Sequence, residues 1–188
     1  MILLIATILG VIGLDQLTKW LAVTQLQGKP SFPLWKDVLH FTYVENRGAA
    51  FGMLSEHRWV FMIISTVAIL GLLVYLLRFA PKSRIVRYSL AMIIGGGIGN
   101  MIDRILLGYV IDFIDFTLID FAVFNVADSF VTVGAFLLMG YMIWDTVKES
   151  KKPKEAEEKK PETEQSNAVS QEASQEAPNG DADKTEDA

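Results

Sequence analysis

The sequence contains no cysteine. Disulfide bonds, a thiolate nucleophile and cysteine-ligated metal sites are therefore all excluded. Charge is also scarce where the chain is most apolar, because residues 59–77 contain no Asp, Glu, Lys or Arg. Hydrophobic residues make up 51% of the chain, which is above the usual range for a soluble domain and indicates a membrane protein.

The net charge of -5 comes from the end of the chain. Residues 1–147 contain 10 basic and 10 acidic side chains, whereas residues 148–188 contain 7 basic and 12 acidic ones. Residues 148–188 also have almost no large apolar residue, so we expect a disordered charged tail without a functional site. No basic patch points to nucleic acid as a partner. The sequence therefore predicts a membrane domain at 1–147 and a tail at 148–188.

Four segments are long and apolar enough to span a bilayer, since about 20 helical residues cross its hydrocarbon core. They are residues 1–21, 59–77, 88–107 and 121–144. No Lys or Arg precedes the first segment and no Ala-x-Ala cleavage site follows it, so we expect a retained helix and not a cleaved signal peptide. The expected fold class is an all-α integral membrane protein with four transmembrane helices.

Basic residues predict the orientation of these helices. Four of them, Arg78, Lys82, Arg84 and Arg87, lie in or beside the short link between the second and third spans, and four lysines follow the last span. The positive-inside rule places both groups in the cytoplasm. Both termini, and the tail, are then expected to be cytoplasmic.

With that orientation the polar residues of the spans fall in the outer leaflet. Asp15, Asn100 and Arg104 come at the outer ends of the first and third spans. Asp128 comes seven residues after the expected start of the fourth span, about 10 Å along a helix axis. An ion pathway would need polar groups through the whole thickness, so this distribution indicates a site near the outer membrane surface.

The outer link between the first two spans, residues 22–58, differs in character. It contains Pro30 and Pro33, and residues 38–44 are rich in β-branched and aromatic side chains. This composition predicts one or more short strands over the outer mouth of the helices.

Asp112 and Asp128 are the sharpest candidates for catalysis. A charged residue at the centre of a span costs about 2.5–3.5 kcal/mol on insertion scales, so such residues are rare without a function. Two carboxyl groups held together at a dry surface share a proton, and the pair can act on a water as base and acid. The alternative is that Asp112 is a solvated loop residue and Asp128 caps or pairs within the bundle.

Two further groups of polar residues have both structural and functional interpretations. Asn100 and Arg104, with Asp103 between them, share one helix face. They could hold the substrate backbone or the catalytic loop, or Asp103 and Arg104 could form an ion pair that closes the third span. Asp15 and Lys19 are four residues apart, which favours a structural ion pair.

Five short blocks together resemble the bacterial lipoprotein signal peptidases (signal peptidase II). The blocks are 15–19 (DQLTK), 46–51 (NRGAAF), 99–104 (GNMIDR), 110–114 (VIDFI) and 124–128 (FNVAD). They occur in the order of that family and at its positions relative to the four spans. Each block alone is a weak signal, but five in register are specific.

The resemblance implies an aspartic endopeptidase that cleaves prolipoproteins before a diacylglyceryl-modified cysteine. It implies that Asp112 and Asp128 are the catalytic dyad. It also assigns substrate positioning or support of the dyad to Asp15, Asn46, Asn100, Arg104 and Asn125. The family's fold is four transmembrane helices with a small extracytoplasmic β-rich cradle.

The same resemblance implies the surroundings of the reaction. The expected location is the bacterial cytoplasmic membrane, as a multi-pass protein with its active site near the outer leaflet. The expected partners are lipid-modified prolipoproteins and membrane lipid, with no obligate protein partner. No metal or other cofactor is required. The long acidic tail is a departure from many family members, and it affects no site residue.

Two other functions are compatible with part of the sequence. Gly108, Asp112 and Asp115 partly imitate the aspartate motif of the metal-dependent CDP-alcohol phosphotransferases, but the upstream half of that motif is missing. A small transporter or channel subunit is the non-enzymatic alternative. The plain inner halves of all four spans weigh against it.

Overall fold

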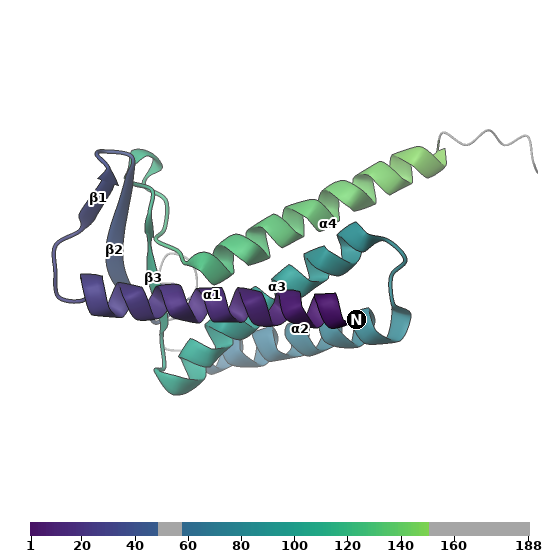
Figure 1. Ribbon diagram of the computed structural model, residues 1–188, viewed down its shortest axis with the longest axis horizontal. Helices are drawn as coiled ribbons and strands as arrows, with labels where there is room; N and C mark the ends of the chain where they lie inside the picture. The colour runs from purple at the N-terminus through teal and green to yellow at the C-terminus, as the bar shows by residue number, and fades with distance from the viewer. Residues whose placement is uncertain (49–57, 151–188) are drawn as a thin grey trace, which may run out of the picture. The chain divides into compact units, whose positions relative to one another are not determined.

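Four long helices dominate the computed structural model, which describes residues 1–48 and 58–150. The helices are α1 (Ile2–Leu26), α2 (Arg58–Phe79), α3 (Arg84–Leu106) and α4 (Val126–Ser150), as Figure 1 shows. Each contains a stretch long and apolar enough to cross a membrane, which confirms the four predicted spans.

Parts of two predictions lie outside the described residues. They are the end of the 46–51 block, at residues 49–51, and the tail from residue 151 onward. The chain divides into two units, Met1–Trp144 and Asp145–Ala188. The candidate site lies wholly in the first unit. The predicted domain boundary after residue 147 stays a prediction.

The third helix begins four residues before the predicted span. Ser83 precedes it in an extended conformation, and its side chain accepts the backbone N–H of Val86 at 3.5 Å. A serine in this position satisfies one of the N–H groups that the first turn of a helix leaves unpaired. The helix therefore starts at Arg84, with the basic side chains of its first turn outside the apolar stretch.

The predicted start of the fourth span at residue 121 is wrong. Phe124 forms a β-bridge with Ile114, and the two residues exchange backbone hydrogen bonds of 2.8 and 3.0 Å. This pairing holds residues 121–124 outside the helix, which begins only at Val126. Asp128 consequently lies in the first turn of α4 and not about 10 Å into a helix.

A three-stranded antiparallel sheet accompanies the helices. It consists of β1 (Phe32–Trp35), β2 (Leu39–Asn46) and β3 (Val110–Asp115), in that order. The first two strands confirm the prediction of short strands between the first two spans, whereas β3 was not predicted as a strand. In Figure 1 the sheet lies at the carboxyl end of α1, where α3 ends and α4 begins.

The register of β2 and β3 determines which polar side chains meet. Val44 pairs with Asp112, and Asn46 pairs with Val110. Residues two apart on a strand share a face, so Asn46 is the diagonal neighbour of Asp112. The sheet thus brings the end of the outer link to the first predicted catalytic residue.

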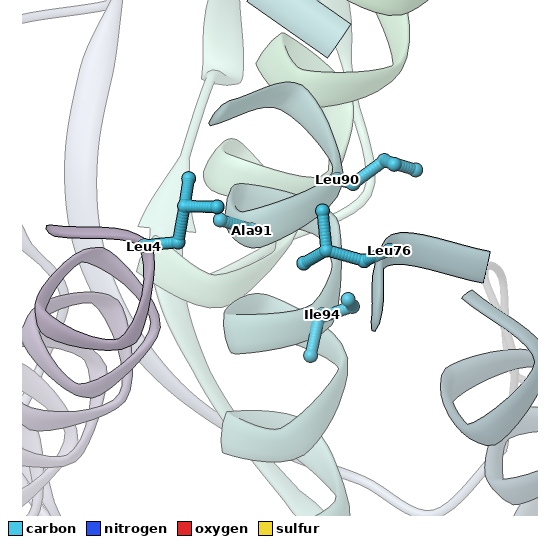
Figure 2. Close-up of a cluster of buried hydrophobic side chains, with 5 residues drawn as sticks. All are labelled: Leu4, Leu76, Leu90, Ala91 and Ile94. Atoms are coloured by element: carbon cyan, nitrogen blue, oxygen red, sulfur yellow. The ribbon is translucent and has the colours of Figure 1, made fainter. Parts of the chain in front are cut away.

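Apolar packing joins the helices at the end away from the sheet. A buried cluster draws on α1, α2 and α3 and is shown in Figure 2. Its members are Leu4, Leu76, Leu90, Ala91 and Ile94. Most apolar side chains of α2 point outward instead, as expected for a helix surrounded by lipid.

Two glycines of α3 allow close approach nearer the sheet. A Cβ atom added to Gly96 would lie 2.5 Å from the backbone oxygen of Ala127, and one added to Gly99 would lie 2.5 Å from Oδ2 of Asp15. Both distances are far below van der Waals contact. Small residues are common where membrane helices pack this tightly. Here they bring α1, α3 and the start of α4 together around a polar interior.

Candidate active site

Six of the seven buried polar or charged residues in the described part of the chain gather at the sheet end of the helices; the seventh, Ser89, lies near the start of α3. The six come from α1, from the last turns of α3, from β3 and from the residue before α4. The buried members are Asp15, Lys19, Asn100, Asp103, Asp112 and Asn125. Burial of a polar group is costly unless it is hydrogen-bonded. Every one of these six side chains has at least one hydrogen bond or ion pair, as the following paragraphs describe.

Asp112 is a strand residue that is only 1% exposed. Its Oδ2 accepts Nδ2 of Asn46 at 2.9 Å, and its Oδ1 accepts Nδ2 of Asn125 at 2.7 Å. Burial raises the pKa of Asp112 to about 6, and the nearby charge of Asp128 adds to the rise, while the two amide donors oppose it. A carboxyl group with this pKa can hold or release a proton near neutral pH.

Asp128 is held by the start of α4. Asn125 precedes the helix and its Oδ1 accepts the backbone N–H of Asp128 at 2.9 Å, while Oδ2 of Asp128 accepts the backbone N–H of Asn125 at 3.3 Å. This reciprocal pattern is a capping box. The other carboxyl oxygen, Oδ1, accepts Nδ2 of Asn100 at 2.7 Å. An acidic side chain in the first turn is a common arrangement, because the amino end of a helix carries partial positive charge.

Two amide side chains connect the aspartates. Asn125 donates its Nδ2 to Asp112 and its backbone N–H to Asp128. Its Nδ2 also donates to Oδ1 of Asn100 at 3.0 Å, and Asn100 in turn donates to Asp128. The carboxyl groups of Asp112 and Asp128 therefore sit in one hydrogen-bonded network, although 15 residues and a change of element separate them.

A buried cation lies behind this network. Nζ of Lys19 is 2.8 Å from Oδ2 of Asp15, 3.0 Å from Oδ2 of Asp103 and 2.9 Å from Oδ1 of Asn100. The predicted pair of Asp15 and Lys19 is confirmed, but it is part of a larger group. Gln16 extends the group, since its Nε2 donates to Oδ1 of Asp103 at 2.9 Å.

Each carboxylate of that group also holds the backbone beside a candidate catalytic residue. Oδ1 of Asp15 accepts the N–H of Ala127, immediately before Asp128, at 3.0 Å. Oδ2 of Asp103 accepts the N–H of Ile111, immediately before Asp112, at 3.1 Å. The two carboxylates thus tie α1 and α3 to the strand and the helix that carry the two aspartates.

Arg104 is half-buried in the last turn of α3. Its Nη1 donates to the backbone oxygen of Asn100 at 3.4 Å. The alternative of an Asp103–Arg104 ion pair closing the span is not what forms, because Asp103 makes its salt bridge with Lys19. The helix face shared by Asn100, Asp103 and Arg104 therefore points its first two members into the network.

All seven site residues expected from the sequence belong to this region. They are Asp15, Asn46, Asn100, Arg104, Asp112, Asn125 and Asp128. Lys19, Gln16 and Asp103 were not among the expected site residues. All three residues belong to the 15–19 and 99–104 blocks, so the sequence did contain a signal for them. The i, i+4 spacing of Asp15 and Lys19 suggested only a pair within α1, and it gave no indication of the salt bridge from Lys19 to Asp103 of α3.

The chemistry available here is that of two carboxyl groups. In general, two carboxyl groups held close together cannot both ionise at low cost, and such a pair can provide a base and an acid. Within residues 1–48 and 58–150, no group of three or more His, Cys, Asp or Glu side chains is arranged to hold a metal ion. Carboxyl groups are among the side chains that act as general acids and bases.

Comparison with known proteins agrees with the geometry. The family model described as signal peptidase (SPase) II matches residues 7–144. A lipoprotein signal peptidase of Caldanaerobacter subterraneus subsp. tengcongensis is 52% identical over 133 residues, which cover 71% of this chain and 90% of that protein. One from Clostridioides difficile is 43% identical over 143 residues, covering 76% and 95%.

A solved structure is also similar. It is a bacterial membrane enzyme determined by the in meso method at 2.3 Å resolution, with a TM-score of 0.74 and 32% sequence identity. The match covers 80% of this chain and 93% of that one. The chain therefore belongs to the lipoprotein signal peptidase (signal peptidase II) family, the membrane aspartic proteases that cleave the signal peptides of lipoproteins.

Proposed function

We propose that Asp112 and Asp128 form the catalytic dyad of this signal peptidase and activate a water molecule between them. The observation that carries the proposal is the position of both carboxyl groups, one buried and one half-buried, in one network of amide donors. Amides bind the two carboxyl groups in place without supplying a competing acid or base. Asp112 and Asp128 are then the titratable groups that exchange protons with the substrate.

The reaction needs one proton on the pair. The ionised aspartate takes a proton from water, and the water oxygen attacks the scissile carbonyl carbon. The protonated partner donates to the carbonyl oxygen and stabilises the charge that develops there. When the tetrahedral intermediate collapses, the C–N bond breaks and a proton passes to the leaving nitrogen, so the products are a carboxylate and an amine.

The supporting residues have separate tasks in this proposal. Asn46 and Asn125 hold the carboxyl group of Asp112, and Asn100 holds that of Asp128. Asp15 supports the dyad through the N–H of Ala127. Arg104, half-buried at the end of α3, contacts the substrate backbone.

The membrane geometry suits a lipid-modified substrate. The basic residues between α2 and α3 support an orientation with that end in the cytoplasm of a bacterial cell, and in this proposal both termini and the tail are cytoplasmic. The dyad then lies at the outer leaflet of the cytoplasmic membrane. A diacylglyceryl cysteine can keep its two acyl chains in lipid at that depth while the preceding peptide bond reaches the aspartates.

The proposal is tested with one prolipoprotein prepared with and without the diacylglyceryl group. We expect purified enzyme to cut only the modified precursor, at the bond before the cysteine, and to keep its activity in EDTA. Equal cleavage of both precursors would show that the lipid is not recognised. Loss of activity in EDTA that is restored by a divalent cation would contradict the metal-free dyad.

A further inference from the structure

Lys19 occupies an unusual position for a residue that was expected only to pair with Asp15. Its side chain is 2% exposed, deep among α1 and α3, and its ammonium group makes three short contacts. An ammonium has three N–H donors and no acceptor. The three contacts, to Asp15, Asp103 and Asn100, therefore use its full capacity.

Each of the three contacts leads to the dyad in one further step. Asp15 holds the N–H of Ala127, the residue before Asp128. Asp103 holds the N–H of Ile111, the residue before Asp112. The third partner, Asn100, donates directly to the carboxylate of Asp128 at 2.7 Å.

The third contact also fixes which way the amide of Asn100 points. Because an ammonium can only donate, it requires the oxygen of Asn100 on its own side. The nitrogen of that amide is then turned toward Asp128. The oxygen that faces Lys19 accepts Nδ2 of Asn125 as well, so the same cation also orients the amide that donates to Asp112.

We propose that Lys19 is the positioning residue of the dyad, which sets the geometry of both aspartates through Asp15, Asp103 and the amide of Asn100. This inference rests on the proposed roles of Asp112 and Asp128. It differs from a purely structural ion pair between α1 and α3, which would stabilise the bundle without affecting the chemistry of each folded molecule. The close approach of α1 and α3 at Gly99 is what allows one cation to reach all three partners.

The test is a double-mutant cycle on purified enzyme with the lipid-modified precursor. It compares Lys19→Met, Asn100→Ala and the double variant, with kcat and KM referred to folded protein. Lys29→Met is the matched control, because Lys29 is an exposed lysine just after α1. Met matches the lysine side chain as far as its ε carbon and lacks the ammonium group, so it removes the charge and the donors.

We expect Lys19→Met to lower kcat about 10- to 100-fold, the loss corresponding to one or two misplaced hydrogen bonds to a charged group, with KM changed less than about threefold. The double variant should lose much less than the product of the two single losses, because both changes act through one amide. The Lys29→Met protein should match the parent.

Two results would overturn the inference. One is a Lys19→Met protein with a lower melting temperature but a parental kcat for each folded molecule. The other is a double variant whose loss equals the product of the single losses. If Lys19→Met does not fold, Lys19→Met/Asp103→Asn replaces it in the cycle, since the group of Asp15, Lys19 and Asp103 then keeps the net charge of -1 that it has in the parent, and the same two results decide.

The outcome is separable from failure of the proposed dyad. If Asp112→Asn and Asp128→Asn abolish cleavage while Lys19→Met behaves like Lys29→Met, only the role of Lys19 is refuted. If either Asp-to-Asn protein remains active, the dyad itself is misassigned.

Discussion

Replacing Asn46 should shift the pKa of Asp112 without replacing either aspartate of the proposed dyad. Its Nδ2 donates to Oδ2 of Asp112 at 2.9 Å, and this hydrogen bond favours the ionised carboxylate. Replacing Asn46 with Ala removes the donor. The pKa of Asp112, already raised to about 6 chiefly by burial, should then rise further.

The size and sign of the shift follow from the structure. A hydrogen bond to a charged group contributes about 1.5–3 kcal/mol, and 1.36 kcal/mol is one pKa unit, so a shift of about one unit remains after water replaces part of the bond. The negative charge of Asp128 contributes to the raised pKa, so the value describes Asp112 losing the last proton of the pair. That step is the basic limb of a bell-shaped profile, which should move to higher pH.

The assay is the pH dependence of kcat/KM, which reports the titration of the free enzyme. Asn46→Asp is the second variant: it keeps an oxygen for the N–H of Gly48, removes the donor and adds a negative charge, so its basic limb should lie higher still. Gln27→Ala is the control, since Gln27 is an exposed amide whose Nε2 bonds only to the hydroxyl of Tyr43 in the described structure. Unmoved basic limbs in both Asn46 variants would refute the reasoning.

Two other perturbations test the packing and the tail. Gly99→Ala should lower the stability by about 1–3 kcal/mol, as overpacking does, and should also lower activity. The reason is that the new Cβ atom would lie 2.5 Å from Oδ2 of Asp15. An unchanged melting temperature would contradict the close approach of α1 and α3. Removing residues 151–188 should leave cleavage intact, since the whole network lies between residues 15 and 128. Slower cleavage by the truncated protein than by the full-length protein would show that the tail has a role.

The sequence was sufficient to predict the four helices, because long apolar stretches have few alternatives in a membrane. It was misleading at the start of α4, where residues 121–124 are apolar but pair with β3. A local signal for the true start was present: Asn125 followed three residues later by Asp128 has the spacing of a capping box. The apolar character of residues 121–124 moved the predicted start of the helix to residue 121 instead.

The sequence pointed to the two candidate aspartates more directly than to the residues that surround them. Asp112 and Asp128 stand out because carboxyl groups are rare near membrane spans. The role of Asp103 could not be read in the same way, because its partners Lys19 and Ile111 lie on other elements and only the folded chain brings them together. The adjacent positions of Asp103 and Arg104 suggested an ion pair between them, but Asp103 pairs with Lys19 of α1 instead.

The family assignment decides between the functions that the sequence left open. A match over residues 7–144 favours the peptidase over a metal-dependent phosphotransferase and over a transporter subunit. The two aspartates that resembled part of a phosphotransferase motif, Asp112 and Asp115, have hydrogen-bond partners of different kinds in the structure. Asp112 is bound by amides, and Asp115 accepts the hydroxyl of Thr42 at 2.7 Å.

The central claim is tested most directly by Asp112→Asn and Asp128→Asn, assayed separately and together for cleavage of a lipid-modified precursor. Asn keeps the shape of Asp but cannot take a proton from water, so each change should cost at least about 10²–10⁴-fold. The double variant should resemble either single one, because both residues act on one water. Asp115→Asn and Asp120→Asn are controls from the same link between α3 and α4 and should stay active. An Asp112→Asn protein that is folded and cuts at more than about a tenth of the parent rate would contradict the dyad.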